Sequence, residues 1–206
     1  MLKRFFRSFP LLLGGAAALA LLPACTTSQV GGSGGSYKVT AYRPRNPDNV
    51  RVKLSNSTQN LYVMEGDRCL MAVQGNVGNA SSPTPTGHYR ITNKEKTRRR
   101  HSEPDAGYPM AYWCEFKPAY GFHEGFVHPR PHTHGCVRLH KEAAARLFAL
   151  VKIGTPVDIA ATQPEDETFG KKVVRLDQSA DPDPPRSFML SAAWFKDPSG
   201  PLLVDQ

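Results

Sequence analysis

Residues 121–140 read GFHEGFVHPRPHTHGCVRLH, which places five of the chain's seven histidines around a single cysteine, Cys136. Such a grouping is typical of a metal site, of a thiol nucleophile with its base, or of a histidine-rich loop without chemistry. Pro129 and Pro131 exclude a continuous helix through the stretch, and Val127 stands where the second histidine of a helical metalloprotease motif would be. We therefore expect strand and loop here, with the cysteine at the junction between them.

Two interpretations of this stretch compete with a reactive thiol. A zinc site could be built from His132, His134 and Cys136, because ligands two residues apart can bind one metal ion from a strand. His123 and His128 are further candidate ligands. The spacing is not diagnostic of a metal, and a histidine can also serve packing alone. That structural interpretation is applied to His88, His101 and His140.

The thiol interpretation rests on the neighbours of Cys136. Gly135 lets a ligand or the backbone approach closely, and backbone N–H groups should lie near the thiol where a strand meets a loop. His123, on the end of an expected strand, can reach Cys136 across a sheet, whereas His134, two residues away on an extended segment, stays an alternative base. We expect a paired His123 to lower the pKa of the thiol from about 8.5 toward 7 or below.

The rest of the chain is rich in strands and turns. Apolar and polar residues alternate, and 17 glycines and 18 prolines punctuate the segments between them. One amphipathic helix is expected within KEAAARLFALVKIG, residues 141–154, with Gly154 as its stop. The fold class is therefore mainly β, with one main helix after the cysteine. Expected strands lie at 50–55, 60–64, 69–73, 88–91, 108–116, 155–160 and 171–176.

The N-terminus predicts an export signal. Three basic residues in MLKRFFRSFP precede an apolar run, LLLGGAAALALL, that is too short to span a bilayer stably. The LPAC that follows resembles a bacterial lipobox, so residues 1–24 are expected to be removed and Cys25 to be lipidated; ordinary cleavage after Ala24 is the alternative. Lipidation would hold the protein on a membrane of the cell envelope, on the periplasmic side, with residues 25–48 as a flexible Gly/Ser tether.

Charge is less informative. The net charge of +8 falls to +5 once the three basic residues of the leader are removed. A basic segment at 94–107, KEKTRRRHSEPDAG, is interpreted as a solvated loop, with binding of carboxylates or phosphates of the envelope as the alternative. No acidic or aromatic pattern surrounds it, so no nucleic-acid-binding module is indicated.

Three motifs resemble one known family. HTHGCVRL is similar to the Ser/Thr-x-Gly-Cys-x-Arg signature of YkuD-type L,D-transpeptidases, GFHEG is similar to that family's second motif, and SPTPTGHYRI is similar to its Pro-Thr-Pro-x-Gly turn. The similarity extends over roughly residues 49–160 and implies a YkuD-like β-sandwich or mixed-sheet catalytic domain at 49–162, followed by an extension of unknown role at 163–206. By position, Cys136 corresponds to the nucleophile and His123 to the general base. The residues that correspond to substrate and oxyanion support are Thr133, His134, Gly135 and Arg138.

The resemblance implies acyl transfer on peptidoglycan stem peptides, without a metal or cofactor. The thiolate of Cys136 would attack the carbonyl between the third residue, a diamino acid, and the terminal D-alanine, while backbone N–H groups stabilise the oxyanion. His123 would pass the thiol proton to the leaving amine, and an amine of another stem or of a protein acceptor would resolve the thioester. Resolution by water would make the enzyme a carboxypeptidase. Two further alternatives are an amidase that releases proteins from peptidoglycan and a peptidoglycan-binding lipoprotein without activity.

The remaining two cysteines, Cys69 and Cys114, both fall on expected strands of a protein in an oxidising compartment. They are interpreted either as a disulfide or as two separately buried thiols. A bridge would require their Cα atoms to lie within about 7 Å of each other.

Overall fold

The structure is a computed structural model that describes residues 37–100 and 108–206. The predicted signal peptide, Cys25, the first part of the predicted tether and His101 lie outside the described residues. The strands are β1 Val50–Ser55, β2 Asn60–Glu65, β3 Arg68–Gln74, β4 Gly87–Arg90, β5 Asn93–Glu95, β6 Trp113–Lys117, β7 Tyr120–Glu124, β8 Val137–Leu139 and β9 Pro156–Ala160. The helices are α1 Lys141–Leu150 and α2 Arg186–Leu190, with short 3-10 turns η1 Pro47–Asn49, η3 Pro164–Glu167, η4 Gly170–Lys172 and η5 Ala192–Phe195. Within the described ranges, no helix is long and apolar enough to cross a membrane.

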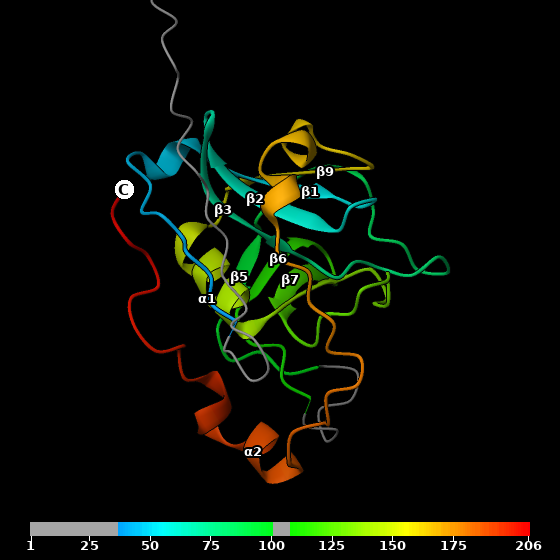
Figure 1. The fold of residues 1–206 in the computed structure, drawn as a ribbon. Coiled ribbons are helices and arrows are strands. Elements are labelled where there is room, and N and C mark those ends of the chain that lie inside the picture. Colours follow the sequence, from blue (N-terminus) through cyan, green and yellow to red (C-terminus); the bar gives the residue numbers. More distant parts are fainter. Residues whose placement is uncertain (1–36, 101–107) are drawn as a thin grey trace, which may run out of the picture.

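Two sheets make up the fold (Figure 1). The five-stranded sheet has the order β3-β2-β1-β9-β4, and the four-stranded sheet has the order β5-β6-β7-β8. Two neighbouring pairs are parallel, β1 with β9 and β7 with β8, and the other pairs are antiparallel. The mainly-β prediction is confirmed, and the expected strands up to residue 91 and at 155–160 are present, whereas the aromatic strand begins only at Trp113.

The two sheets and α1 share one hydrophobic core. In β1, Val52 and Leu54 point into it, and Val157 and Ile159 do the same from β9. This alternation is what the sequence pattern predicted, because side chains two residues apart in a strand lie on the same face. Helix α1 packs on β7 and β8, the two strands that carry the site described below.

Helix α1 ends at Leu150, four residues before the predicted stop at Gly154. The ammonium group of Lys94 donates to the carbonyl oxygens of Phe148 and Val151 at 2.7 and 2.6 Å, and it thereby satisfies acceptors that the helix end leaves unpaired. Lys94 begins the predicted basic loop, so this member of the loop serves the core rather than the solvent. Gly154 instead occupies a turn at φ +90°, which favours glycine.

Residues 37–48 correct the predicted boundary of the tether. Val39 and Ala41 are buried in the core, and the backbone N–H of Tyr42 donates to the carbonyl of Leu70 at 2.9 Å. The apolar residues of SYKVTAY alternate and therefore pack like a short edge segment, although the Gly/Ser composition just before them suggested a coil. The folded unit thus begins before the predicted domain start.

The predicted strand at 171–176 is also wrong. This segment starts within η4 and continues without strand pairing. Its backbone extends neither edge strand of the five-stranded sheet, β3 or β4. The segment instead crosses the outer face of the sheet, where Val173 packs in a small cluster that contains Tyr62 and Met64.

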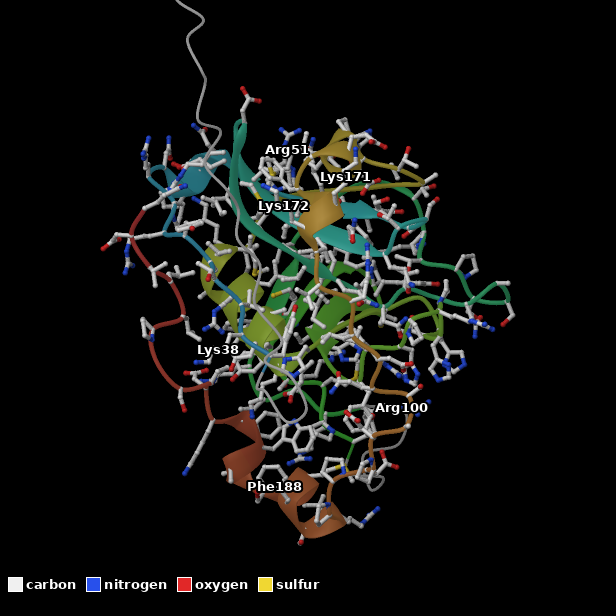
Figure 2. All side chains as sticks on the ribbon, in the orientation of Figure 1. Lys38, Arg51, Arg100, Lys171, Lys172 and Phe188 are labelled. Atoms are coloured by element: carbon white, nitrogen blue, oxygen red, sulfur yellow. The ribbon has the colours of Figure 1, made fainter. Side chains whose placement is uncertain are left out.

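The C-terminal extension, residues 163–206, runs from one end of the molecule to the other and back (Figure 1). From the five-stranded sheet it passes the four-stranded sheet to α2, and its last residues return to the first sheet, where the N–H of Val204 donates to the carbonyl of Ala41 at 2.9 Å. Figure 2 shows Lys171 and Lys172 of this extension at one end of the molecule and Phe188 at the other.

The basic segment holds the extension in place. Lys96 forms an ion pair with Asp197 at 2.9 Å, and the guanidinium of Arg99 donates to the carbonyl oxygens of Met189 and Leu190 at 2.9 and 3.0 Å. The described part of the segment, residues 94–100, is therefore not a solvated loop. Residues 96–99 instead contact α2 and Asp197, which lie 90 or more positions later in the chain.

Cys69 and Cys114 are buried and are not joined by a disulfide, so the alternative of two separate thiols is the one observed. Cys69 belongs to the cluster on the outer face of the five-stranded sheet. Cys114 lies on β6 and points into the main core. The two side chains are therefore separated by the sheet that carries Cys69.

Asp166 fastens the start of the extension to the five-stranded sheet. Its carboxylate accepts hydrogen bonds from the hydroxyls of Ser55, Thr58 and Tyr62 at 2.8, 2.8 and 2.7 Å, and from the N–H of Gln163 at 2.9 Å. Ser55 and Tyr62 are fully buried. Loss of the carboxylate would leave buried donors without an acceptor.

We therefore expect Asp166→Ala to lower the free energy of unfolding by about 2–4 kcal/mol, because the buried hydroxyl of Tyr62 and the N–H of Gln163 lose their acceptor at once, and Ser55 keeps only the carbonyl of Ala161. Chemical denaturation followed by tryptophan fluorescence measures this change. Glu167→Ala is the matched control, since that side chain is exposed on the same turn and pairs only with Lys171 at the surface. Equal effects of the two substitutions would contradict the role given to Asp166.

Candidate active site

The parallel pairing of β7 with β8 brings the predicted nucleophile and base into one cleft. Phe122 pairs with Val137 and His123 with Arg138, so Cys136, just before β8, lies beside the start of β7. Both Cys136 and His123 line a cleft of about 630 Å³. Of the other predicted site residues, Thr133, His134 and Arg138 line the same cleft, and Gly135 lies buried beneath it.

The turn that presents Cys136 requires glycine at position 135. Gly135 has φ +106°, and a Cβ there would lie 2.4 Å from the ring of Tyr120. The hydroxyl of Thr133 donates to the carbonyl of Cys136 at 2.5 Å and accepts from the N–H of Gly135 at 3.1 Å. Thr133 therefore closes the turn from inside, which is a positioning role.

Thr84 is a positioning residue that sequence reasoning missed. Its hydroxyl donates to the carbonyl of Gly135 at 3.0 Å and accepts from the N–H of Gly78 at 2.9 Å. Thr84 is buried and lies in the SPTPTG turn, between two prolines that hold the backbone extended. The two prolines indicate a rigid turn, but the local sequence does not show which residues Thr84 contacts.

The thiol of Cys136 is half-buried and its proton is held in place. The Sγ atom donates to the carbonyl of Ala119 at 3.6 Å. Burial raises the pKa of the Cys136 thiol, while the N–H of Gly121 and the positive charges of Arg138 and Arg98 oppose this rise. The expectation of a lowered thiol pKa is therefore wrong, because desolvation outweighs the favourable charges.

His123 is a neutral imidazole with a defined tautomer. Its Nδ1 atom lies 2.6 Å from the carbonyl oxygen of Glu124, which can only accept, so Nδ1 carries the proton and Nε2 is free to take one. The pKa of His123 is lowered to about 4, mainly by burial and also by the charges of Arg138 and Arg98, while the hydrogen bond to Glu124 opposes this shift. The ring is 5 % exposed and lies 5.9 Å from the ring of Trp113.

Glu124, the residue after this histidine, is buried behind the cleft. Burial raises the pKa of its carboxyl to about 7, and the charge of Lys141 opposes the rise. It lines a small cavity of about 90 Å³ that also contacts the C-terminal extension at Met189 and Trp194. Its side chain therefore faces away from the thiol.

The other histidines divide into surface and structural groups. His128 and His132 stack on each other with ring centroids 4.1 Å apart, and among the described residues no three His, Cys, Asp or Glu side chains are placed to hold a metal ion. The zinc alternative from His132, His134 and Cys136 thus has no support in the geometry. His140 caps α1 by accepting from the N–H of Glu142 at 3.2 Å, which is a structural role as predicted. His88 is exposed, and its Nδ1 lies 2.6 Å from the carboxylate of Asp158 at the surface.

The C-terminal extension supplies one wall of the cleft, which the sequence did not predict. Gln178, Ser179, Asp181 and Asp183 line it together with His123 and Cys136. These residues sit in a polar, Pro-rich segment without periodicity, so no local signal placed them near the thiol.

Comparison with known protein families identifies the part of the chain that contains Cys136 and His123. Residues 49–159 match the family model of the YkuD L,D-transpeptidase catalytic domain. No curated protein sequence is similar enough to this chain to count as a match.

Solved structures of the same family are similar in fold. An L,D-transpeptidase from Stackebrandtia nassauensis has a TM-score of 0.51 and 23% identity, over 60% of this chain and 60% of that chain. An L,D-transpeptidase from Xylanimonas cellulosilytica has a TM-score of 0.49 and 22% identity, over 58% and 65% of the two chains. Mycobacterium tuberculosis L,D-transpeptidase 1 has a TM-score of 0.48 and 22% identity, over 55% and 62%. This chain therefore spans about 60% of the length of these relatives. The likeness to the Stackebrandtia nassauensis structure is one of fold.

The family model covers more than half of the chain, and it contains both strands of the cleft together with the turn that carries Cys136. The chain therefore belongs to the YkuD family of L,D-transpeptidase catalytic domains.

Proposed function

We propose that the protein is a peptidoglycan L,D-transpeptidase that uses Cys136 as its nucleophile. The observation that carries this proposal is the parallel pair β7 and β8, which brings the thiol of Cys136 and the neutral imidazole of His123 to the lining of one cleft. The substrate is a stem tetrapeptide, and the bond attacked is the amide between its third residue, a diamino acid, and the terminal D-alanine.

The reaction would proceed in two acyl-transfer steps. In the first, Sγ of Cys136 bonds to the carbonyl carbon, Nε2 of His123 takes the thiol proton, and backbone N–H groups, including that of Cys136, stabilise the oxyanion. The C–N bond then breaks, the leaving amine of D-alanine takes the proton from His123, and a thioester remains. In the second step an acceptor amine attacks the thioester, forms the new amide, and its proton returns through His123 to the sulfur.

The resting pair is neutral, since burial raises the pKa of Cys136 and lowers the pKa of His123. Proton transfer therefore accompanies attack and does not precede it. A neutral thiol reacts slowly with chance electrophiles, so this arrangement favours reaction with a carbonyl that binding has placed against Sγ.

Incubation of the protein with purified muropeptides tests the proposal. We expect new crosslinks between two third residues, detected by mass spectrometry of the products, and release of D-alanine. Shortened stems without crosslinks would show a carboxypeptidase, and release of attached protein would show an amidase on the same scaffold. Retention of muropeptides without any turnover would overturn the enzymatic proposal in favour of a binding lipoprotein.

We also propose that the enzyme works in the periplasm, attached to a membrane through Cys25, and that the acceptor amine belongs to another stem or to a protein. The leader sequence supports the attachment, since a short apolar run precedes a lipobox-like LPAC. Residue 37, the first described, would then stand about a dozen residues from the lipid, within reach of the nearby wall polymer.

A further inference from the structure

The acidic side chains of the catalytic cleft come from outside the family domain. The residues that line the cleft include two carboxylates, Asp181 and Asp183, and both belong to the C-terminal extension, beyond the family match that ends at residue 159. The basic residues in the same lining are Arg100, labelled in Figure 2, and Arg138. A cationic group that enters the cleft therefore has these two aspartates as its anionic partners.

The segment that carries them, residues 178–183, is fixed against the loop that follows β7, the strand that bears His123. The N–H of Gln178 donates to the carbonyl of Val127 at 2.9 Å, and the side-chain oxygen of Gln178 accepts from the N–H of Val127 at 3.1 Å. The amide group of the same glutamine donates to a carboxylate oxygen of Asp181 at 3.2 Å. Val127 is fully buried, so the segment is anchored to the core and not merely laid over it.

The two aspartates lie on one wall of the cleft. They stand two positions apart on either side of Pro182, and both line the cavity that contains Cys136. Asp183 has no hydrogen-bond or ion-pair partner within the described ranges, and Asp181 retains one oxygen beyond its bond to Gln178. Two adjacent carboxylates with acceptor sites to spare form a good receptor for a primary ammonium group.

We propose that Asp181 and Asp183 select donor stems by binding the free side-chain ammonium of the third residue; this inference rests on the proposed function. Charge complementarity favours the donor over the acceptor as the source of this ammonium. Carboxylates stabilise the protonated amine, which suits a group that does not react. An acceptor amine must instead lose its proton before it can attack the thioester.

The test uses pairs of tetrapeptide donors that differ only in acetylation of the side-chain amine of the third residue, with lysine and with diaminopimelate at that position. Thioester formation at Cys136 is followed by intact-protein mass spectrometry. We expect the wild-type protein to react about 10-fold faster with the free amine at low concentration, and this preference to decline with salt. The double variant Asp181→Asn, Asp183→Asn should lose the preference through a higher KM for the free-amine donor, with kcat unchanged and the acetylated donor unaffected.

Glu167→Gln is the matched control, because it removes one negative charge from the extension outside the cleft and should keep the preference. An equal loss of rate with both donors in the double variant would show a merely structural wall and overturn the inference, and so would a preference that survives the double substitution. A wild-type protein that forms no thioester with any of the peptides would instead overturn the proposed function itself.

Discussion

Replacement of Cys136 by alanine is expected to reduce kcat for acyl transfer by a factor on the order of 10⁴ or more, because the covalent intermediate forms on its thiol. The cleft lining contains this one thiol among the described residues, and the neighbouring hydroxyl of Thr133 is committed to the carbonyl of Cys136. The fold should be unaffected, since the side chain is small and the hydrogen bonds of its sulfur, to the carbonyl of Ala119 and from the N–H of Gly121, are weak.

The acyl-enzyme itself is the best readout. The wild-type protein should gain the mass of a stem tripeptide after incubation with a tetrapeptide donor, and Cys136→Ala should gain nothing. Cys69→Ala is the control, since it removes a buried thiol on the outer face of the five-stranded sheet and should leave the mass gain intact. A mass gain that persists in Cys136→Ala would place the nucleophile elsewhere.

Replacement of His123 by alanine is expected to lower kcat by about 10²–10⁴-fold, the range in which a positioned general base contributes. His128→Ala is the matched control, because His128 also lines the cleft but stacks on His132 and lies on a loop beyond β7. We expect that control to change kcat by less than a factor of about 3, as is usual for residues that only line a site.

The pH dependence distinguishes the buried base from a solvated one. Since burial lowers the pKa of His123 to about 4, the ring is neutral and able to accept a proton at every pH above that value. The acid limb of kcat/KM should therefore appear as pH falls through about 4, and not near the ordinary histidine pKa of about 6.5. An acid limb near 6.5 that disappears in a His134→Ala variant would assign the base to His134, which is exposed.

Local patterns predicted the parts of the fold that local physics decides. The alternation of Val50, Val52 and Leu54 marked β1 because one face of that strand is buried, and the glycine before the cysteine marked a turn that only glycine can make. Cys136 and His123 were found by their motifs, and the sheet does bring them to one cleft.

What the sequence did not predict depends on partners far away in the chain. KKVVRL has strand composition, yet it packs on the outer face of the five-stranded sheet through Val173 and does not pair along an edge. The basic residues at 94–100 look like a solvated patch until the extension that covers them is known. The pKa of the Cys136 thiol also depends on burial, which the sequence does not show. Beside an exposed cysteine, a protonated histidine would lower the thiol pKa, whereas burial of Cys136 raises it.

The parallel pairing of β1 with β9 has a consequence for how the chain folds in time. Val52 pairs with Val157, so the central strand of the five-stranded sheet acquires its second neighbour only from a segment about a hundred residues later. Closing so long a loop costs entropy before the contact repays it, which places such β topologies among the slow folders, on a scale of milliseconds to seconds. On the ribosome the β1–β2–β3 hairpins can form early, but the sheet stays open at β1 until residue 157 has emerged. During that interval an apolar strand edge is exposed, and this is the period in which the nascent chain is most prone to aggregate.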